Sequence, residues 1–148
     1  MILILLGSLS VASAADAISG SVVKVLPLFL DLKGHDAVSP SLFDRDAYQF
    51  HLRQHTNEIS AVRFDVLWKA AKAPQETIKI TVELRGIGTN SIPTLHTMET
   101  NVVPGTFRKW TAIPLAGDDY RRLGRVIAWR VTLWGGQQRL GAENSFLW

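Results

Sequence analysis

The sequence of 148 residues contains no cysteine. Many small secreted domains depend on disulfides, so this chain must be held together by packing alone, whatever its compartment. The absence also excludes a cysteine nucleophile and lipid attachment at a lipobox cysteine. Asn-x-Ser/Thr sequons are absent too, which is compatible with a bacterial protein.

A large excess of one charge is also lacking. The chain has 16 Lys and Arg against 13 Asp and Glu, a formal charge of +3. A mildly basic balance of this size is typical of an ordinary solvated surface. Because the sequence contains no DNA- or RNA-binding motif, we expect no nucleic-acid partner.

Motifs that carry chemistry by themselves are missing as well. There is no Gly-x-Ser-x-Gly elbow, and Gly86-Ile87-Gly88 lacks the rest of any phosphate-binding fingerprint. His51 and His55 have the i, i+4 spacing of a zinc pair, but Leu52 stands where His-Glu-x-x-His requires Glu. The sequence therefore predicts a protein that is not an enzyme and has no cofactor, with His51 and His55 as weak candidates for metal ligands.

The N-terminus predicts export. An apolar run over residues 2–6 is followed by small residues and by Ala12-Ser13-Ala14, an A-x-A cleavage site. The run is shorter than the about 20 residues that cross a membrane, so we expect a signal peptide at residues 1–14 and no transmembrane segment in the mature chain. No Lys or Arg precedes the run, so the signal is atypical or the natural start lies upstream of Met1. The alternative is a buried N-terminal strand.

The clearest structural pattern is the alternation over residues 77–86. Ile78, Ile80, Val82 and Leu84 fall on one parity, and polar or charged residues fall on the other. Side chains alternate across a strand, so this segment has one buried and one wetted face. Such a pattern is typical of an antiparallel sheet with one face exposed to solvent.

Similar patterns predict further strands, separated by turn signals. Their ranges are residues 22–32, 60–69, 93–103, 107–115, 125–134 and 138–148. With residues 77–86 these make about seven strands, which favours a mainly β fold, a single antiparallel immunoglobulin-like β-sandwich over residues 15–148. In the first strand, Pro27 removes a ladder donor and predicts a sheet edge, and Leu26, Leu28, Leu30 and Leu32 share a face.

The predicted core follows from the inward parity of these strands. Its members are Val62, Phe64, Val66, Trp68, Ile78, Ile80, Val82, Leu84, Ile127, Trp129, Val131, Leu133 and Phe146.

One early helix is expected at residues 42–54. Ser41 is a suitable N-cap, and Asp44 three residues later forms a pair like a capping box. Phe43, Ala47 and Phe50 recur at helical spacing. We expect this apolar stripe to lie on the sheet. A shorter helical turn is predicted over residues 117–124.

Two segments, VLPLFLDLKG…SPSLFDRDAYQFHLRQH near the N-terminus and WRVTLWGGQQRLGAENSFLW at the C-terminus, resemble a group of small uncharacterised bacterial exported proteins. The resemblance covers most of the mature chain. It implies export and a single compact domain, and it carries no activity and no functional residue.

Tryptophan is abundant, with five residues in 148. Trp134 has outward parity beside a Gly-Gly turn, and Trp110 lies opposite in parity to Phe107 and Ile113. Exposed tryptophans anchor protein partners or stack on sugars; the alternative is that both pack under the helix or the crossing loops.

These features predict a periplasmic or extracellular bacterial binding or scaffold module with Trp110 and Trp134 as its binding residues. A protein partner of the cell envelope is preferred over a glycan, because residues 22–32 and 93–103 are candidate edge strands where a partner strand could add. A carbohydrate-binding module is the alternative, and a metal-dependent hydrolase built on His51 and His55 is the third possibility.

Overall fold

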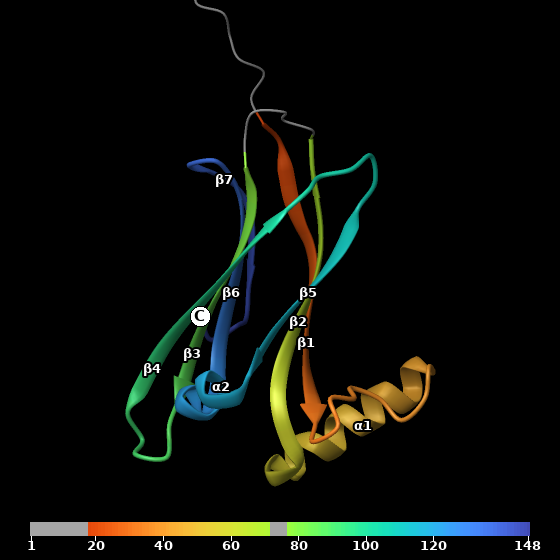
Figure 1. The fold of residues 1–148 in the computed structure, drawn as a ribbon, viewed down its shortest axis with the longest axis vertical. Coiled ribbons are helices and arrows are strands. Elements are labelled where there is room, and N and C mark those ends of the chain that lie inside the picture. The colour runs from red at the N-terminus through yellow and green to blue at the C-terminus, as the bar shows by residue number, and fades with distance from the viewer. Residues whose placement is uncertain (1–17, 72–76) are drawn as a thin grey trace, which may run out of the picture.

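The computed structural model describes residues 18–71 and 77–148. The predicted signal peptide, residues 1–14, lies outside these ranges. The described residues form seven strands in two antiparallel sheets that pack face to face (Figure 1). The predicted β-sandwich is therefore confirmed.

Three strands make one sheet and four make the other. Sheet A has the order β1 (Gly20–Asp31), β2 (Ile59–Ala70), β5 (Lys109–Ala116). Sheet B has the order β4 (Pro93–Val102), β3 (Ile78–Ile87), β6 (Arg125–Gly135), β7 (Gln138–Asn144).

The position of β4 distinguishes this sandwich from the constant-type immunoglobulin domain. In that domain the fourth strand extends the sheet that contains strands one, two and five. Here β4 pairs with β3 in sheet B instead. As a result, none of the strands in the described ranges lies on the outer side of β5, which forms a free edge of sheet A.

The core between the sheets matches most of the predicted set. All four alternating residues of β3, from Ile78 to Leu84, are at most 1% exposed. Trp68 is also buried, and its indole N–H donates to the Thr111 hydroxyl at 2.8 Å. Because Trp68 lies on β2 and Thr111 on β5, this bond links two strands of sheet A within the core. It also satisfies the polar atom of a buried tryptophan.

Two of the predicted core residues lie elsewhere. Ile127 is the extra residue of a bulge, because Arg85 pairs with Ala128 and Gly86 pairs with Val126. The bulge reverses the parity of the first part of β6, so Val126 packs against the core in place of Ile127.

Phe146 was also predicted in the core and is 100% exposed. The strand β7 ends at Asn144, before the aromatic residues of the C-terminus. Ser145 then donates its backbone N–H to the Trp129 carbonyl at 2.9 Å, and its hydroxyl accepts from the Trp129 N–H at 3.0 Å. This anchor starts a turn that carries Phe146 out of the sheet. Trp129 itself is half-buried and packs against the core, with its ring edge-on to Phe64.

The helix α1 (Leu42–Gln54) has the predicted bounds, and the Ser41 hydroxyl accepts from the Asp44 N–H as expected of an N-cap. The predicted buried face is wrong, since Phe43 is 81% and Phe50 59% exposed. The buried residues of the helix are Gln49 and Leu52.

The orientation of α1 follows from its position beside the strand β1 (Figure 1). The Gln49 side chain accepts from the Phe29 N–H and donates to the Phe29 carbonyl, both at 2.8 Å. This amide pairs with the backbone as a neighbouring strand would. The helix therefore covers the edge of β1 with a polar contact and leaves its apolar stripe in solvent.

At the end of the sandwich that carries α1, a 3-10 turn, η1 (Thr56–Glu58), leads into β2, and the short helix α2 (Gly117–Leu123) leads into β6 (Figure 1). Leu123 is buried between the sheets. Gly124 follows with φ of 72°, and a Cβ there would lie 2.3 Å from the Ile87 carbonyl oxygen, so the turn requires glycine. Within the described ranges, no helix is long and apolar enough to cross a membrane.

Candidate functional site

The free edge of β5 offers unpaired backbone groups. In an antiparallel sheet, alternate residues of an edge strand direct N–H and C=O away from their neighbour. Proline within a sheet occupies such outward positions, so Pro114 assigns the outward set to Trp110, Ala112 and Ala116. The edge thus presents backbone donors and acceptors at Trp110 and Ala112, and Pro114 removes one donor.

The register across sheet A leads to the same assignment. Phe29 in β1 directs its N–H toward Gln49 and away from β2, so its partner Val62 bonds to β5 instead. Val62 pairs with Leu115. The odd-numbered residues of β5 therefore bond to β2, and the even-numbered ones face the free edge.

Apolar side chains lie on the outer face of sheet A beside this edge. Trp110 is 52% exposed and lies directly across from Leu67. We define the Trp110 patch as Leu26, Leu67, Trp110, Ala112 and Pro114, which the strand register places on this one face. The result is an exposed tryptophan with apolar neighbours next to an unpaired strand edge.

Part of the charge on the same face is compensated. Arg63 donates to both carboxylate oxygens of Asp65, at 2.7 and 2.9 Å, and pairs with Asp36 at 3.4 Å. The hydrogen bond to Asp65 raises the pKa of the Arg63 guanidinium. Lys24, directly across from Leu67, takes part in no ion pair within the described residues, so one free positive charge borders the patch.

The second predicted binding residue, Trp134, lies on the opposite side of the molecule. It pairs with Lys79 of β3, whose side chain points outward from sheet B. Trp110 and Trp134 therefore face in opposite directions and form no common aromatic platform. Trp134 instead borders a groove of about 350 Å³ together with Thr81, Glu83 and Arg130.

Trp148 also lies on the outer face of sheet B. The Arg85 and Arg130 guanidinium carbons lie 4.2 and 4.7 Å from its ring centre, within the range of a cation–π contact. The sequence pattern placed Trp148 in the last strand and did not indicate this contact. The outward parity of Arg85 and Arg130 was the only signal, and it does not reveal that the chain folds back over them.

The structure brings His51 and His55 together on the last turn of α1 and at its C-cap. Their rings stack at 4.1 Å. His51 Nε2 lies 2.8 Å from a Glu58 oxygen, and His55 Nδ1 lies 2.9 Å from the His51 carbonyl oxygen. In stacked rings the nitrogen lone pairs point in parallel directions and do not converge on one metal ion. Among the described residues, no group of three or more His, Cys, Asp or Glu is arranged to hold a metal ion.

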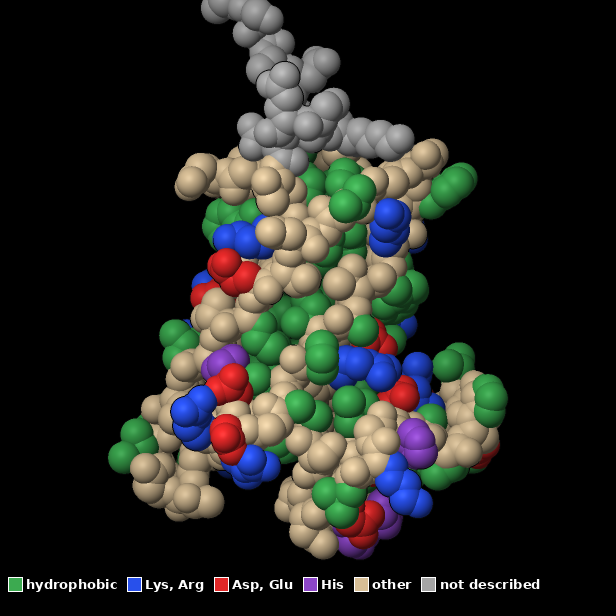
Figure 2. Space-filling view, viewed as in Figure 1, with side chains coloured by type: hydrophobic (Ala, Val, Ile, Leu, Met, Phe, Trp, Pro, Cys, Tyr) green, Lys and Arg blue, Asp and Glu red, His purple; other side chains and the backbone are tan. Residues whose placement is uncertain are grey.

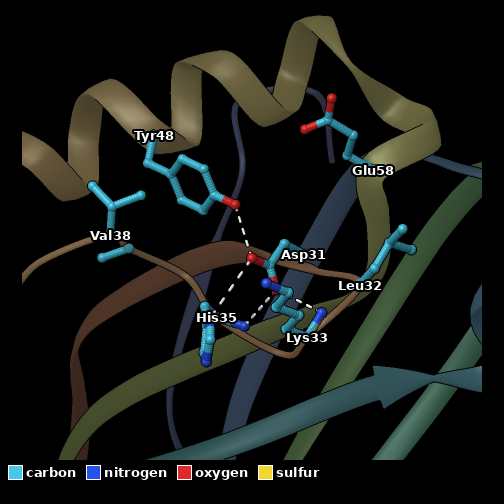
Figure 3. A pocket seen from close by; sticks show the side chains of 8 residues that line it. Asp31, Leu32, Lys33, His35, Val38, Tyr48 and Glu58 are labelled. Carbon is cyan, nitrogen blue, oxygen red and sulfur yellow. Dashed lines mark hydrogen bonds and ion pairs between the residues drawn. The ribbon is translucent and has the colours of Figure 1, made fainter.

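A neighbouring open cavity of about 710 Å³ contains Asp31 and Tyr48 (Figure 3). The Asp31 carboxylate accepts from the His35 and Lys33 backbone N–H groups at 2.9 and 2.8 Å, and from the Tyr48 hydroxyl at 2.8 Å. The His35 N–H is the main cause that lowers the pKa of Asp31, and the bond to Asp31 raises the pKa of Tyr48. These bonds fix the turn between β1 and α1 and hold Asp31 ionised.

Comparisons with known proteins give no family. No family model matches the chain, and no curated protein matches it. Among solved structures, a β-glucosidase from Kluyveromyces marxianus is similar with a TM-score of 0.33 and 10% identity, over 87% of this chain and 14% of that chain. A similarity this weak carries no functional argument.

Proposed function

We propose that this chain is an exported, non-catalytic module that binds a protein partner at the free edge of β5. The partner adds an extended segment to sheet A and packs a side chain against Trp110. The observation that carries this proposal is the juxtaposition of the unpaired edge with an exposed tryptophan. Strand addition of this kind obtains affinity from backbone hydrogen bonds and specificity from side-chain contacts.

The chemistry of the edge favours a polypeptide as the partner. Trp110 and Ala112 present N–H and C=O groups at the repeat of a β-ladder, which an extended peptide backbone matches, and Ala116, the N-cap of α2, adds an N–H. Tryptophan is among the residues that dominate protein interfaces when surrounded by near-neutral contacts. The small side chains of Ala112 and Ala116 leave space for a partner to approach.

Peptide selection tests the proposal directly. Random 12-residue peptides displayed on phage are selected on the wild-type protein and then assayed against Trp110→Ala and Ala112→Pro. The proline removes one outward N–H and leaves the ladder with β2 intact. Trp134→Ala, the same change on the opposite face, is the matched control.

We expect selected peptides to lose binding to Trp110→Ala and Ala112→Pro and to keep it with Trp134→Ala. Peptides that bind Ala112→Pro as well as wild type would contradict strand addition. Selection that yields no peptide dependent on Trp110 would contradict the site itself.

Export to the periplasm or the cell exterior is part of the same proposal and is supported by the N-terminal sequence. Cleavage after Ala14 would leave Ala15 as the first residue. Edman sequencing of protein recovered from the periplasm and from the medium tests this expectation. Recovery of protein that begins at Met1 in the cytosol would contradict it.

One observation favours glycan binding on sheet B as a second candidate function. Thr81 is 8% exposed, and its hydroxyl has no hydrogen-bond partner in the described part of the chain. It borders the groove beside Trp134, but the hydroxyl is shielded from the groove, so a sugar stacked on the indole could supply the missing bond once the Thr81 side chain rotates. Glycan-array binding that Trp134→Ala abolishes and Trp110→Ala preserves would support this function, and an array without binding would contradict it.

A further inference from the structure

A second cavity, at the end of the sandwich that carries α1 and α2, has a distinctive lining. It measures about 640 Å³, within the range of about 300–1,000 Å³ found for small-molecule sites. The lining residues come from β1, the end of α1, η1, β2, α2 and the start of β6. They are Phe29, Arg53, Thr56, Ile59, Tyr120, Arg121, Gly124, Arg125 and Val126.

Every charged residue that lines this cavity is an arginine. Arg53, Arg121 and Arg125 are present, and no aspartate or glutamate accompanies them. Arg121 pairs with Asp118, which is outside the lining. Over residues 18–71 and 77–148, neither Arg53 nor Arg125 takes part in an ion pair. The mouth of the cavity therefore has an uncompensated positive charge.

Many charged side chains on the visible face gather toward the same end of the molecule, in the lower half of Figure 2. Arginine suits an anionic ligand because its planar fork donates two parallel hydrogen bonds to a carboxylate or phosphate. Positive charge focused at the mouth of a concave site also attracts anions from solution.

The remaining wall is mostly apolar. Phe29 and Val126 pack against the main core, and Ile59 is 9% exposed. Tyr120 is half-buried, and desolvation raises the pKa of its phenol, so the ring stays neutral at physiological pH. An apolar group buried against such a wall is removed from water, which favours binding.

The turn after α2 brings two of the arginines to the same cavity. Gly124 reverses the chain with a left-handed φ, close against Ile87. Arg121 lies before this turn and Arg125 after it, and both line the cavity. A residue with a Cβ at position 124 would clash with the β3 backbone and displace this arrangement.

We propose that this cavity binds a small anionic amphiphile. The carboxylate or phosphate head lies among Arg53, Arg121 and Arg125, and the apolar body lies against Phe29, Ile59 and Val126. The site shares no residue with the Trp110 patch and goes beyond protein binding at β5.

Isothermal titration calorimetry with four probes tests this site. Octanoate and octyl phosphate have the two candidate heads, octanamide is the neutral counterpart of octanoate, and acetate is the head without the apolar body. We expect both octyl anions to bind, and octanamide and acetate each to bind at least about tenfold more weakly. The stronger of the two anions identifies the head group.

Two substitutions supply a matched pair. Arg125→Gln removes a positive charge from the cavity and should weaken octanoate at least about fivefold. Arg122→Gln removes the same charge from α2 outside the lining, where Arg122 pairs with Asp119, and should leave binding unchanged. Thermal denaturation followed by circular dichroism checks that both variants are folded. If Arg125→Gln is unfolded, Arg53→Gln takes its place.

Four results would overturn the proposal. If octanamide binds as tightly as octanoate, the arginines do not recognise the charged head. If acetate binds as tightly as octanoate, the apolar wall does not contribute to binding. No binding of either octyl anion up to about 10 mM, which corresponds to less than about 3 kcal/mol, would remove the site. An equal loss in Arg122→Gln and Arg125→Gln would show nonspecific attraction and would count against it as well.

Discussion

The two edges of sheet A differ: other described elements cover the edge at β1, whereas the edge at β5 is open. Along β1, Pro27 removes one donor, and the Gln49 amide pairs with Phe29. The strand β7 runs close to the first part of β1, where a Cβ on Gly141 would lie 3.0 Å from Ser21 Cα. Along β5, Pro114 removes one donor, and no described strand or helix other than β2 pairs with Trp110 or Ala112.

This difference indicates where sheet A is closed and where it is open to pairing. Natural sheets protect edges with prolines, charges, bulges or covering elements, because a free edge pairs with other chains. The edge of β1 has a proline, a bulge after Val22 and a covering helix. The edge of β5 has a single proline and an exposed Trp110, which favours a controlled contact with a partner over complete protection.

The largest change in the free energy of unfolding is expected when the contact between α1 and the edge of β1 is removed. Gln49→Met keeps the length of a buried side chain and removes its amide, leaving the Phe29 N–H and carbonyl without their partner. Each buried unsatisfied group costs about 1–3 kcal/mol, so we expect a loss of about 2–4 kcal/mol in the free energy of unfolding. Urea denaturation measures it.

Gln54→Met, an exposed position on the same helix, is the control and should cost less than about 0.5 kcal/mol. Equal stability of the Gln49 and Gln54 variants would show that α1 does not hold the edge of β1 through this amide.

The covering of β1 also shows what the sequence can and cannot predict. The bounds of α1 follow from Ser41, Asp44 and helical spacing, which act within a few residues. The buried face of α1 cannot be predicted in this way. The spacing of Phe43 and Phe50 favours an apolar contact, whereas the helix packs against the backbone of a strand edge. A contact between Gln49 and Phe29, 20 residues apart, leaves no local signal.

The same limit applies to the candidate site. The outward parity of Trp110 is predicted from β5 alone, since alternation is local. That β5 is an edge depends on the pairing of β4 with β3, which alternation cannot determine. The bulge at Ile127 reverses parity within a strand that otherwise looks regular.

A substitution at the open edge of β5 should lower the affinity for a peptide and hardly change the free energy of unfolding. Trp110→Ala removes the exposed indole, and we expect selected peptides to bind about 30-fold more weakly, or about 2 kcal/mol. The free energy of unfolding should fall by less than about 1 kcal/mol, because the side chain is 52% exposed. Fluorescence anisotropy with a labelled peptide measures the affinity. A loss of stability as large as that of Gln49→Met would show that Trp110 is a structural residue.

A smaller effect is expected from the backbone of the same edge. Ala112→Pro removes one donor and disturbs pairing with the partner next to it, so affinity should fall about tenfold, or about 1.4 kcal/mol. Because Ala112 is exposed and its N–H faces away from β2, stability should change by less than about 1 kcal/mol. Thr111→Pro is the contrasting variant, since its N–H bonds to β2, and it should destabilise the fold more than Thr111→Val, which removes only the hydroxyl that accepts from Trp68. Equal destabilisation by the two prolines would contradict the assignment of the outward set.

The smallest effect concerns the turn that leads from β1 to its covering helix. The folded pKa of Asp31 lies below its ordinary value of 3.8, mainly because its carboxylate accepts from the His35 N–H. The stability that it contributes is therefore present above the unfolded pKa and is lost as the pH falls through the folded value. Asp31→Asn should lower the free energy of unfolding by about 1 kcal/mol at pH 7, and this difference from wild type should shrink as the pH falls below 3.8. Urea denaturation from pH 7 to pH 3 follows the difference, with Asp46→Asn, an exposed position on α1, as the control. A difference that is constant with pH would show that the charge of Asp31 does not support the turn.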